Sequence, residues 1–539
     1  MFDRREFIKT AAAAGSLGLV QPIQALALRN QTSAGFFRVH PFVDSNPEAV
    51  FIMKTNVDVK TNHDAVKSAG KALATSVLVP SDSGVPLTNL FPIKPNITYV
   101  TWTGPPAQDA EYRMGVITDP WFVEGIIERY KSLGVAGNQI TVLDVWNDDT
   151  NRKLNGYADM TQRQGVNMNP GITTLAALGS NLITWVDAPN GVYFRKIPYI
   201  YPVNAPNSWL LDVSKFKAHG MGITLCCKNI QGTIAKSYQE HCSRYDAKMS
   251  IDFANANPNW SPDIGANYTR HKTAGIPRWD KPGTSGGIWM ETWASRCLDN
   301  NSVTKSGLHV IEGVYGRDGD GFLNGPNKGT KLASGEAWDY MSNIIIFGKN
   351  QFNVDIIGHW MAGQEPGNFG LFHIAKERGL TNRLNPANIP VYEWKADGTA
   401  TLTPLKNFTR TPLLTYYLQK DYSGGTEAKY HLVNEPFTYA PETTVVEEID
   451  RPQAFLLHQN RPNPFNPNTS IQYDLPKAGN ARLEVFNEQG QLVEVLADGY
   501  TQAGRHMAVW NTQNRASGTY FYRFLYGGYS ETKKMLLLK

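Results

Sequence analysis

Hydrophobic and polar positions follow two different patterns along this chain. From about residue 36 to residue 395, short apolar runs of strand length are separated by stretches in which apolar residues recur every three or four positions. The strand candidates are Ala49–Lys54, Ile97–Trp102, Gln139–Val145, Leu182–Val186, Leu210–Val213, Leu308–Val314 and Asn343–Phe347. This pattern predicts an α/β domain over residues 36–395, with a parallel or mixed sheet covered by helices on both faces.

The stretch Asp119–Leu133 shows the helical pattern most clearly. Its apolar residues fall on one face of a helix, and they are Val123, Ile126, Ile127 and Tyr130. Asp119 is a good capping residue, and Pro120 is tolerated in the first helical turn. The sequence therefore predicts a helix that begins beside Asp119.

The pattern changes after about residue 395. Residues 396–458 contain short extended pieces and polar turns, which predict a connector, and Asn460–Asn468 is rich in Asn and Pro and indicates a linker-like junction. Short alternating runs follow within residues 459–539, and they are Ser470–Asp474, Ala481–Phe486, Leu492–Leu496, His506–Trp510, Gly518–Tyr526 and Glu531–Leu538. Short strands with evenly spaced turns predict a small all-β sandwich.

Composition narrows the possible functions. The chain has 539 residues and a formal net charge of +4, with Lys and Arg spread along its length, so no nucleic-acid partner is predicted. Its 4 cysteines form no CxxC pair, which argues against ferredoxin-type clusters and zinc ribbons. We expect Cys226 and Cys227 to be buried, unreactive thiols.

The first residues have the layout of a signal peptide. A basic start is followed by a short Ala/Gly/Leu stretch and by small residues that end at Ala25-Leu26-Ala27. Arg4-Arg5 and the residues after them resemble the twin-arginine consensus, which implies a twin-arginine signal peptide at residues 1–27. That pathway carries folded proteins, often loaded with a cofactor. No later stretch approaches 18 unbroken apolar residues, so the mature protein is predicted to be soluble, without a transmembrane segment.

Residues 459–539 resemble the C-terminal sorting domain of type IX secretion cargo and the related Ig-like flagellar-hook-capping module. The matching pieces are QNRPNPFNP at 459–467, VFNEQG at 485–490, VWN at 509–511, ASGTYFYR at 516–523 and KKMLLLK at 533–539. The resemblance implies an address rather than an activity. It implies passage through the periplasm and then delivery to the cell surface or medium, with the twin-arginine translocase and the type IX machinery as partners.

Most of residues 40–385 resemble the domain of unknown function 362 family, which has no settled chemistry. The matching pieces are IKPN at 93–96, KFKAHGMGITLCCKNIQG at 215–232, the Gly-rich stretch 313–325, NVD at 353–355 and AKERGL at 375–380. Two departures stand out: Phe216 replaces an aliphatic residue, and the ferredoxin module of some relatives is absent.

Several of these polar residues follow apolar runs, where open α/β sheets bind ligands. Lys217 and His219 are the candidate catalytic residues, because a Lys and a His there could hold an anion or move a proton. The candidate ligand-binding residues are Lys94, Asn96, Thr224, Lys228 and Asn229. The last three are expected at a helix start, where free N–H groups favour an anion. Three lysines brought together without matched acids would also attract one.

Two interpretations remain open from the sequence. The first is an enzyme that acts on a small anionic molecule, with Glu312 and Asp355 as further site candidates and with the metal or cofactor undetermined. The second is a non-catalytic binding or structural protein displayed at the surface. The Asp318-Gly319-Asp320-Gly321 loop has calcium-loop spacing, but Phe322 stands where another oxygen ligand belongs, so a turn is favoured.

Overall fold

The structure is a computed structural model of the whole chain. The residues that it describes are 35–98, 114–145, 149–169, 178–219, 222–235, 264–274, 276, 288–319, 324–325, 335–414, 455–476, 479–501, 504–512 and 515–539. Contacts divide the chain into two units, residues 1–439 and 440–539, which are considered separately. The expected signal peptide at residues 1–27 lies outside the described residues.

A large mixed sheet forms the first unit, in the strand order β17-β16-β2-β15-β12-β10-β5-β6-β7. Its strands are β2 (Val50–Lys54), β5 (Phe91–Pro95), β6 (Ile140–Val142), β7 (Asn167–Met168), β10 (Leu210–His219), β12 (Ser306–Arg317), β15 (Asp339–Gly348), β16 (Val391–Trp394) and β17 (Ala400–Leu402). The central strands β12, β10, β5, β6 and β7 are parallel, and β15 is antiparallel to both of its neighbours. β11 (Gly222–Thr224) pairs with the end of β10 as a hairpin.

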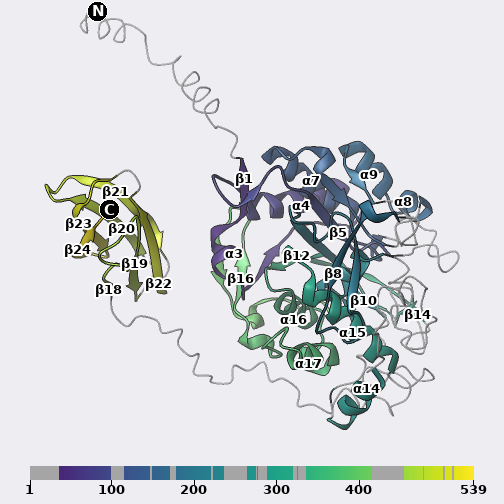
Figure 1. Cartoon of the computed structure of the whole chain (residues 1–539). Coiled ribbons are helices and arrows are strands. Elements are labelled where there is room, and N and C mark those ends of the chain that lie inside the picture. Colours follow the sequence, from purple (N-terminus) through teal and green to yellow (C-terminus); the bar gives the residue numbers. More distant parts are fainter. Residues whose placement is uncertain are drawn as a thin grey trace, which may run out of the picture. The chain divides into compact units, whose positions relative to one another are not determined.

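Helices cover both faces of this sheet (Figure 1). One face packs against α4 (His63–Val77) and α7 (Pro120–Leu133), around a core that contains Leu211 and Val213 of β10. The other face packs against α11 (Cys226–Asn229), α15 (Ile288–Val303), α16 (Gln351–Met361) and α17 (Gly370–Glu377), around a core that contains Phe216 and Ala218. The α/β fold with helices on both faces is thus confirmed. Among the described residues, no helix is long and apolar enough to span a bilayer.

The remaining elements of this unit lie around the sheet. A small sheet has the order β3-β1-β4, and β8 pairs with β9 in another. Their bounds are β1 (Phe36–Val39), β3 (Leu78–Ser81), β4 (Val85–Pro86), β8 (Ile183–Asp187) and β9 (Lys196–Ile200); β13 (Asn324–Gly325) and β14 (Gly335–Glu336) form a further pair. Further α-helices of the described residues are α3 (Pro41–Ser45), α8 (Asp149–Leu154), α9 (Tyr157–Gln164) and α14 (Ile264–Thr273).

The capping residue, the proline and the apolar face seen in the sequence predicted α7 correctly. The Asp119 carboxylate accepts a hydrogen bond from the Trp121 amide at 2.8 Å and caps the helix, whose first residue is Pro120. Gly134 ends the helix at φ 105°, a conformation that glycine adopts without a steric penalty. The apolar face predicted for this helix is buried against the sheet.

Two differences from the predicted strand bounds bear on the candidate site. The expected strand at Ile97–Trp102 was wrong at its start: the strand is β5, which ends at Pro95, while residues 99–102 lie outside the described part. The strand predicted at Leu210–Val213 was also wrong at its end, because β10 continues to His219. Lys94 and Lys217 therefore lie inside buried strands and not beyond their ends.

The second unit is a sandwich of two antiparallel sheets. One sheet has the order β18-β19-β22 and the other β21-β20-β23-β24. The bounds are β18 (Leu456–Leu457), β19 (Asn468–Leu475), β20 (Gly479–Asn487), β21 (Leu492–Thr501), β22 (Gly504–Asn511), β23 (Gly518–Tyr526) and β24 (Tyr529–Leu537). Ile471, Leu483, Trp510, Tyr522 and Leu537 meet in one core between the sheets. The predicted small all-β domain is confirmed.

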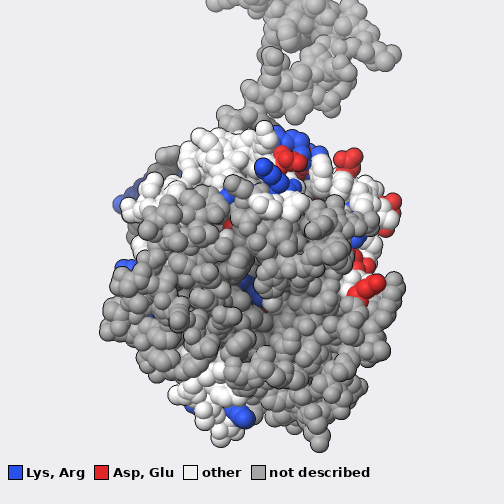
Figure 2. All heavy atoms as spheres, turned by 90° about the vertical axis from the view of Figure 1, so that its right-hand side faces the viewer, with Lys and Arg blue, Asp and Glu red and all other residues white. Residues whose placement is uncertain are grey.

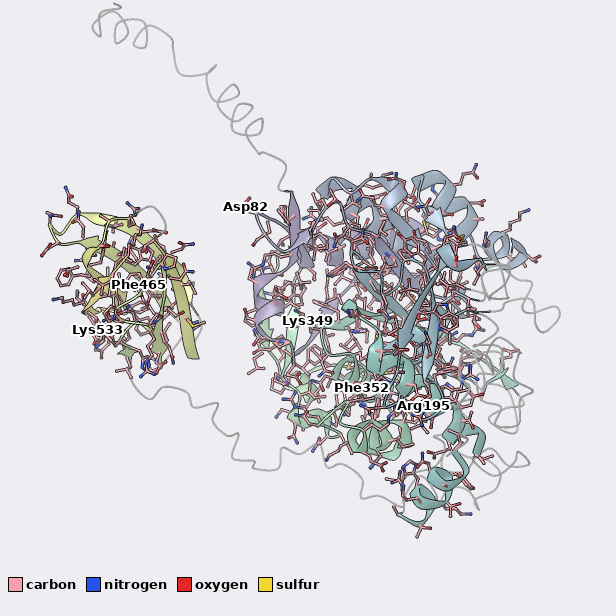
Figure 3. All side chains as sticks on the ribbon, in the orientation of Figure 1. Asp82, Arg195, Lys349, Phe352, Phe465 and Lys533 are labelled. Atoms are coloured by element: carbon pink, nitrogen blue, oxygen red, sulfur yellow. The ribbon has the colours of Figure 1, made fainter. Side chains whose placement is uncertain are left out.

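The Asn/Pro-rich segment before β19 is part of this sandwich, so the expectation of a linker-like junction there was wrong. The Tyr522 hydroxyl accepts from the Asn460 amide at 2.9 Å. Phe465, labelled in Figure 3, is 3% exposed, and its ring centre lies 5.7 Å from that of Trp510. Its amide donates to the Leu536 carbonyl at 3.0 Å, and the Leu538 amide donates back to its carbonyl at 3.1 Å. The segment is thus held by the last strand.

Candidate functional site

Lys217 and His219, the candidate catalytic residues, lie at the carboxyl end of β10. They pair across the hairpin with Thr224 and Gly222 of β11. Lys217 points to the α7 side of the sheet, because the alternate residues Phe216 and Ala218 belong to the opposite core. Its Nζ donates to the Val116 carbonyl. The two candidates therefore share one strand end with Thr224, which the sequence had placed at a helix start.

Positive charges gather around this strand end. Lys217 pairs in register with Arg317 of β12, and each is 1% exposed, whereas His219 and Lys228 are half-buried. Burial, and then the charges of Lys228, Arg317 and Lys215, hold the pKa of Lys217 well below its usual range. Burial and the nearby lysines likewise hold the pKa of His219 well below its usual range. We call Lys217, His219, Lys228 and Arg317 the cationic cluster.

The cationic cluster has one acidic neighbour on β15. The Arg317 guanidinium lies 3.4 Å from the Asp339 carboxylate, which Lys60 also approaches at 2.8 Å. A Cβ on Gly115 would come within 1.8 Å of this carboxylate, so glycine is required for the chain to pass there. Two cations thus share Asp339.

Two buried polar atoms near the strand ends have no hydrogen-bond partner among the described residues. One is the hydroxyl oxygen of Thr224, which is 0% exposed and lies beside the cluster, and the other is the amide oxygen of Asn96, which is 8% exposed. The Asn96 amide nitrogen donates to Asn229 at 3.3 Å, and Asn229 also binds Lys94. An unsatisfied buried polar group costs about 1–3 kcal/mol, so each such group calls for an explanation. A ligand bound between the strand ends would supply a partner.

Lys94 and Asn229 belong to a separate network on the opposite face. The Lys94 ammonium contacts the Asp144 carboxylate at 2.6 Å and the Asn229 amide oxygen at 2.8 Å. The Asn229 amide nitrogen donates to Asp212 at 2.6 Å, and Asp212 lies 3.0 Å from Nδ1 of His309. We call these five residues the buried chain. The expectation of three lysines without matched acids was therefore wrong for Lys94, which pairs with Asp144.

Gly232 shows how tightly the Lys94–Asp144 pair is enclosed. A Cβ at this position would lie 2.5 Å from Cε of Lys94 and 3.0 Å from the Asp144 carboxylate. Lys94 is itself held by three acceptors, so its side chain has little freedom to move away. Glycine at this position therefore allows the 3-10 turn Ile230–Thr233, which follows α11, to lie against the pair.

The start of α11 already carries an anion that belongs to the protein. The Cys226 and Cys227 amides each donate to the Asp355 carboxylate at 2.8 Å. Burial raises the pKa of Asp355 to about 7. The helix spans only Cys226–Asn229, so Lys228 and Asn229 lie at its end. The expectation that Thr224, Lys228 and Asn229 surround a free helix start was therefore wrong.

A third buried group connects β10, β12 and α7. The Lys215 ammonium lies 2.7 Å from the Glu312 carboxylate and 3.4 Å from the centre of the Tyr315 ring, and both charged side chains are 0% exposed. The Tyr315 hydroxyl donates to Asp119 at 2.6 Å. Burial raises the pKa of Glu312. Glu312, a further candidate from the sequence, thus pairs with Lys215.

The sequence analysis missed several residues of these groups: Asp144, Asp212, Lys215, His309 and Arg317. One signal was available. Asp212 and Lys215 interrupt an apolar strand, and a charged residue in a buried strand must have a partner. The partners themselves could not be identified, because Lys215 and Glu312 are 97 positions apart.

Burial of the cysteines was predicted correctly, and Asp318 of the Asp-rich loop is hydrogen-bonded within the protein. Cys226, Cys227 and Cys297 are buried and free, and burial raises the pKa of Cys226 and Cys227 well above the usual range. The Asp318 carboxylate accepts from the Trp338 amide at 2.7 Å and from the Tyr340 hydroxyl at 2.9 Å. Asp320 lies outside the described residues.

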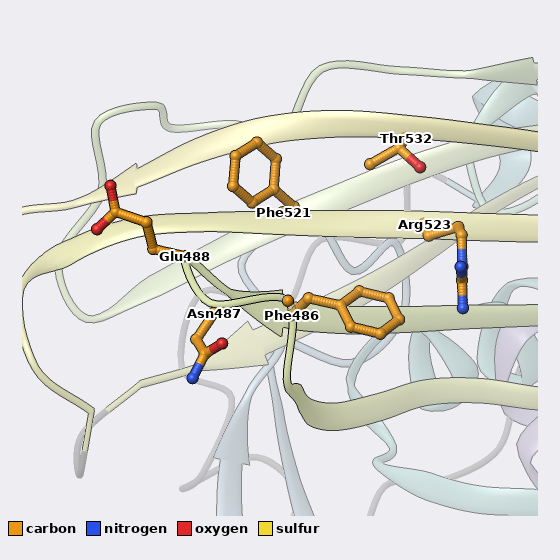
Figure 4. A pocket seen from close by; sticks show the side chains of 7 residues that line it. Phe486, Asn487, Glu488, Phe521, Arg523 and Thr532 are labelled. Atoms are coloured by element: carbon orange, nitrogen blue, oxygen red, sulfur yellow. The ribbon is translucent and has the colours of Figure 1, made fainter.

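The surface adds two further observations. In Figure 2, basic and acidic side chains both occur on the described upper part of the face that is shown. The tail carries a shallow pocket of about 280 Å³, lined by Phe486, Asn487, Glu488, Gly490, Phe521, Arg523 and Thr532 (Figure 4). The Arg523 guanidinium lies 4.7 Å from the centre of the Phe486 ring and also contacts Glu484 at 2.8 Å. None of the site residues predicted from the sequence lines this pocket.

Comparison with known protein families gives two matches. Residues 92–359 match the family model "Domain of unknown function (DUF362)", which covers β5 through most of α16. Residues 461–538 match the "Secretion system C-terminal sorting domain", which covers most of the sandwich. A search of curated proteins found no match. The chain therefore combines a domain of unknown function with a type IX sorting tail, which indicates a protein secreted to the cell surface or medium.

Proposed function

We propose that the α/β unit is an enzyme that acts on a small anionic molecule at the cationic cluster. The observation that carries the proposal is the convergence of Lys217, Lys228 and Arg317 beside the unpartnered Thr224 hydroxyl. The cluster lies at the carboxyl ends of β10 and β12, where open α/β sheets bind their ligands. Lys228 and His219 are half-buried and would form the rim of the site. Lys217 and Arg317 are buried and would form its floor.

The four side chains of the cluster would have different roles, which depend on their charge. Arg317 and Lys228 attract the carboxylate or phosphate of the substrate, since a guanidinium keeps its charge even when buried. The lowered pKa of Lys217 favours its neutral amine, which can donate a hydrogen bond to the bound anion and can accept a proton from the substrate. His219 is neutral for the same reason and donates or accepts a hydrogen bond at the rim. Thr224 would align the substrate.

Export completes the proposal. A twin-arginine signal at residues 1–27 would move the folded α/β unit into the periplasm, and the sorting tail, which we take to be Ig-like, would hand it to the type IX machinery. The support for the first step is the Arg4-Arg5 pattern, and the support for the second is the family match of residues 461–538. The substrate would then be met at the cell surface or in the medium.

An anion that fits the cluster should stabilise the mature protein. Thermal unfolding with inorganic phosphate, sulfate and a set of dicarboxylates should show a rise in Tm for at least one of them. At 100-fold excess over Kd the gain is about 2.7 kcal/mol. The same anion should give a much smaller rise in the Lys217→Met and Thr224→Val variants.

Suitable controls come from the same chain. Lys71 on α4 is an exposed lysine paired with Glu128, so Lys71→Met should keep the full response. Without ligand, Thr224→Val should be at least as stable as the wild type, because it removes an unsatisfied hydroxyl. No rise with any anion, or an equal rise in Lys217→Met, would contradict the proposed site.

A non-catalytic binding protein is the second candidate. The observation in its favour is that Lys94 and Asn229, two predicted ligand contacts, form hydrogen bonds within the buried chain. Such a protein would bind the anion through the rim of the cluster and leave it unchanged. Product analysis after incubation with the stabilising anion separates the two candidates, since only the enzyme alters it.

A further inference from the structure

We propose that Asp212, Cys226 and His309 form a buried site for a transition-metal dication such as Zn²⁺. One carboxylate oxygen, the thiol sulfur and one imidazole nitrogen lie within 4.8 Å of one another. The three residues come from β10, α11 and β12, so the fold alone brings them together. This site is distinct from the cationic cluster and stands independently of the proposed function.

The donor set selects the metal. Sulfur, nitrogen and one carboxylate oxygen suit zinc or ferrous iron, whereas calcium and magnesium prefer oxygen ligands alone. Asp212 and Cys226 are fully buried, and the side chain of His309 is 5% exposed. Three protein ligands leave the fourth position of a tetrahedral zinc to a further ligand.

Charge balance supports a cation at this place. Asp212 contacts Asn229 and His309, and Asp355 accepts the amides of Cys226 and Cys227. Within the described part of the chain, no Lys or Arg side chain is hydrogen-bonded to either carboxylate. Buried charges are normally paired or coordinate a metal. A dication beside Asp212 would supply the missing positive charge.

The surroundings hold the ligands in place. Asn229 fixes one oxygen of Asp212 and is itself held by Lys94. The Ser214 hydroxyl lies 3.4 Å from the Cys226 sulfur. Hydrogen bonds of this kind orient metal ligands and tune their affinity. Because the ligands are buried beneath α11, the ion must bind before that helix closes over the sheet, and the metal is loaded while the protein folds.

The first test is the metal content of the mature protein purified from the cells that export it. We expect about one zinc or iron per chain by elemental analysis. Cys226→Ser and His309→Gln should lower metal affinity by more than about tenfold. Cys297→Ser and His359→Gln replace a buried thiol and a buried imidazole outside the trio and should keep the metal. Equal metal content in all four variants would refute the site.

Cobalt gives a test that does not depend on those variants folding. In a chain with Cys227, Cys242 and Cys297 replaced by serine, Cys226 is the only thiol. Refolding this chain and the wild type with Co²⁺ should produce a thiolate-to-cobalt absorption band in both. The proposal is overturned if native protein is metal-free and the wild type refolded with Co²⁺ shows no such band.

Discussion

Replacing Lys215 by methionine is expected to destabilise the α/β unit by about 3–5 kcal/mol. The substitution leaves the Glu312 carboxylate, 0% exposed, without the ammonium that lies 2.7 Å away. Asp119 lies close enough for its charge to raise the pKa of Glu312, so the remaining carboxylate would also be repelled. The urea midpoint of the α/β transition in the mature chain measures the loss.

Two further variants separate the charge from the packing. Lys54 forms an exposed pair with Glu393, so Lys54→Met should cost no more than about 1 kcal/mol. Adding Glu312→Leu to Lys215→Met should recover much of the loss, because no buried charge is then left uncompensated. A Lys215→Met chain as stable as Lys54→Met would show that the pair contributes nothing.

Deleting residues 455–539 is expected to abolish delivery to the surface or medium while the α/β unit stays folded. The tail has its own core and strands, so its removal takes no strand from the large sheet. The deletion begins at Phe455, because its ring stacks on Phe524 at 5.4 Å. Cell fractionation should find the shortened protein in the periplasm with a cooperative unfolding transition.

Point variants decide whether the folded tail or only its sequence is recognised. Leu483 is 0% exposed in the sandwich core, whereas Met507 is 68% exposed on β22. Leu483→Asp should unfold the tail and block delivery, and Met507→Asp should leave both intact. Normal secretion of the Leu483→Asp chain would mean that a linear signal is sufficient, and secretion of the deleted chain would exclude the tail as the address.

Local patterns predicted the elements well where a residue's environment follows from its neighbours. The helix beginning at Pro120 has its cap, its proline and its apolar face within a few positions of one another. The tail strands were found because each alternates between core and solvent, as Gly518–Tyr526 does. Such signals do not depend on distant contacts.

The pattern failed where distant residues decide the environment. β5 contains Pro92 and Pro95, residues that usually argue against an inner strand, so the expected strand was displaced to the next apolar run. The predicted end of β10 at Val213 was too early because Lys215 and Lys217 look exposed in the sequence. Glu312 and the strands on either side of β10 make them buried residues.

The candidate site was only partly predictable for the same reason. The sequence placed Lys217 and His219 at the end of one strand, and both lie there, although that strand is longer than predicted. Because the strand was predicted to end at Val213, the sequence could not show that Lys217 lies on one face of the sheet and Lys94 on the other, which splits the predicted group into the cationic cluster and the buried chain. Whether these residues bind a ligand stays a prediction.

The Asn/Pro-rich segment is bonded to the β24 end of the chain, so the sandwich can close only after both parts have been synthesised. The backbone of Phe465 bonds to Leu536 and Leu538, and the Leu536 amide donates to the Asn463 side chain at 2.9 Å. The ribosome makes Asn463 more than seventy residues before these partners. The sandwich therefore cannot close until translation has passed residue 538. A chain truncated before residue 536 would lack these bonds, so its tail would not close in this way.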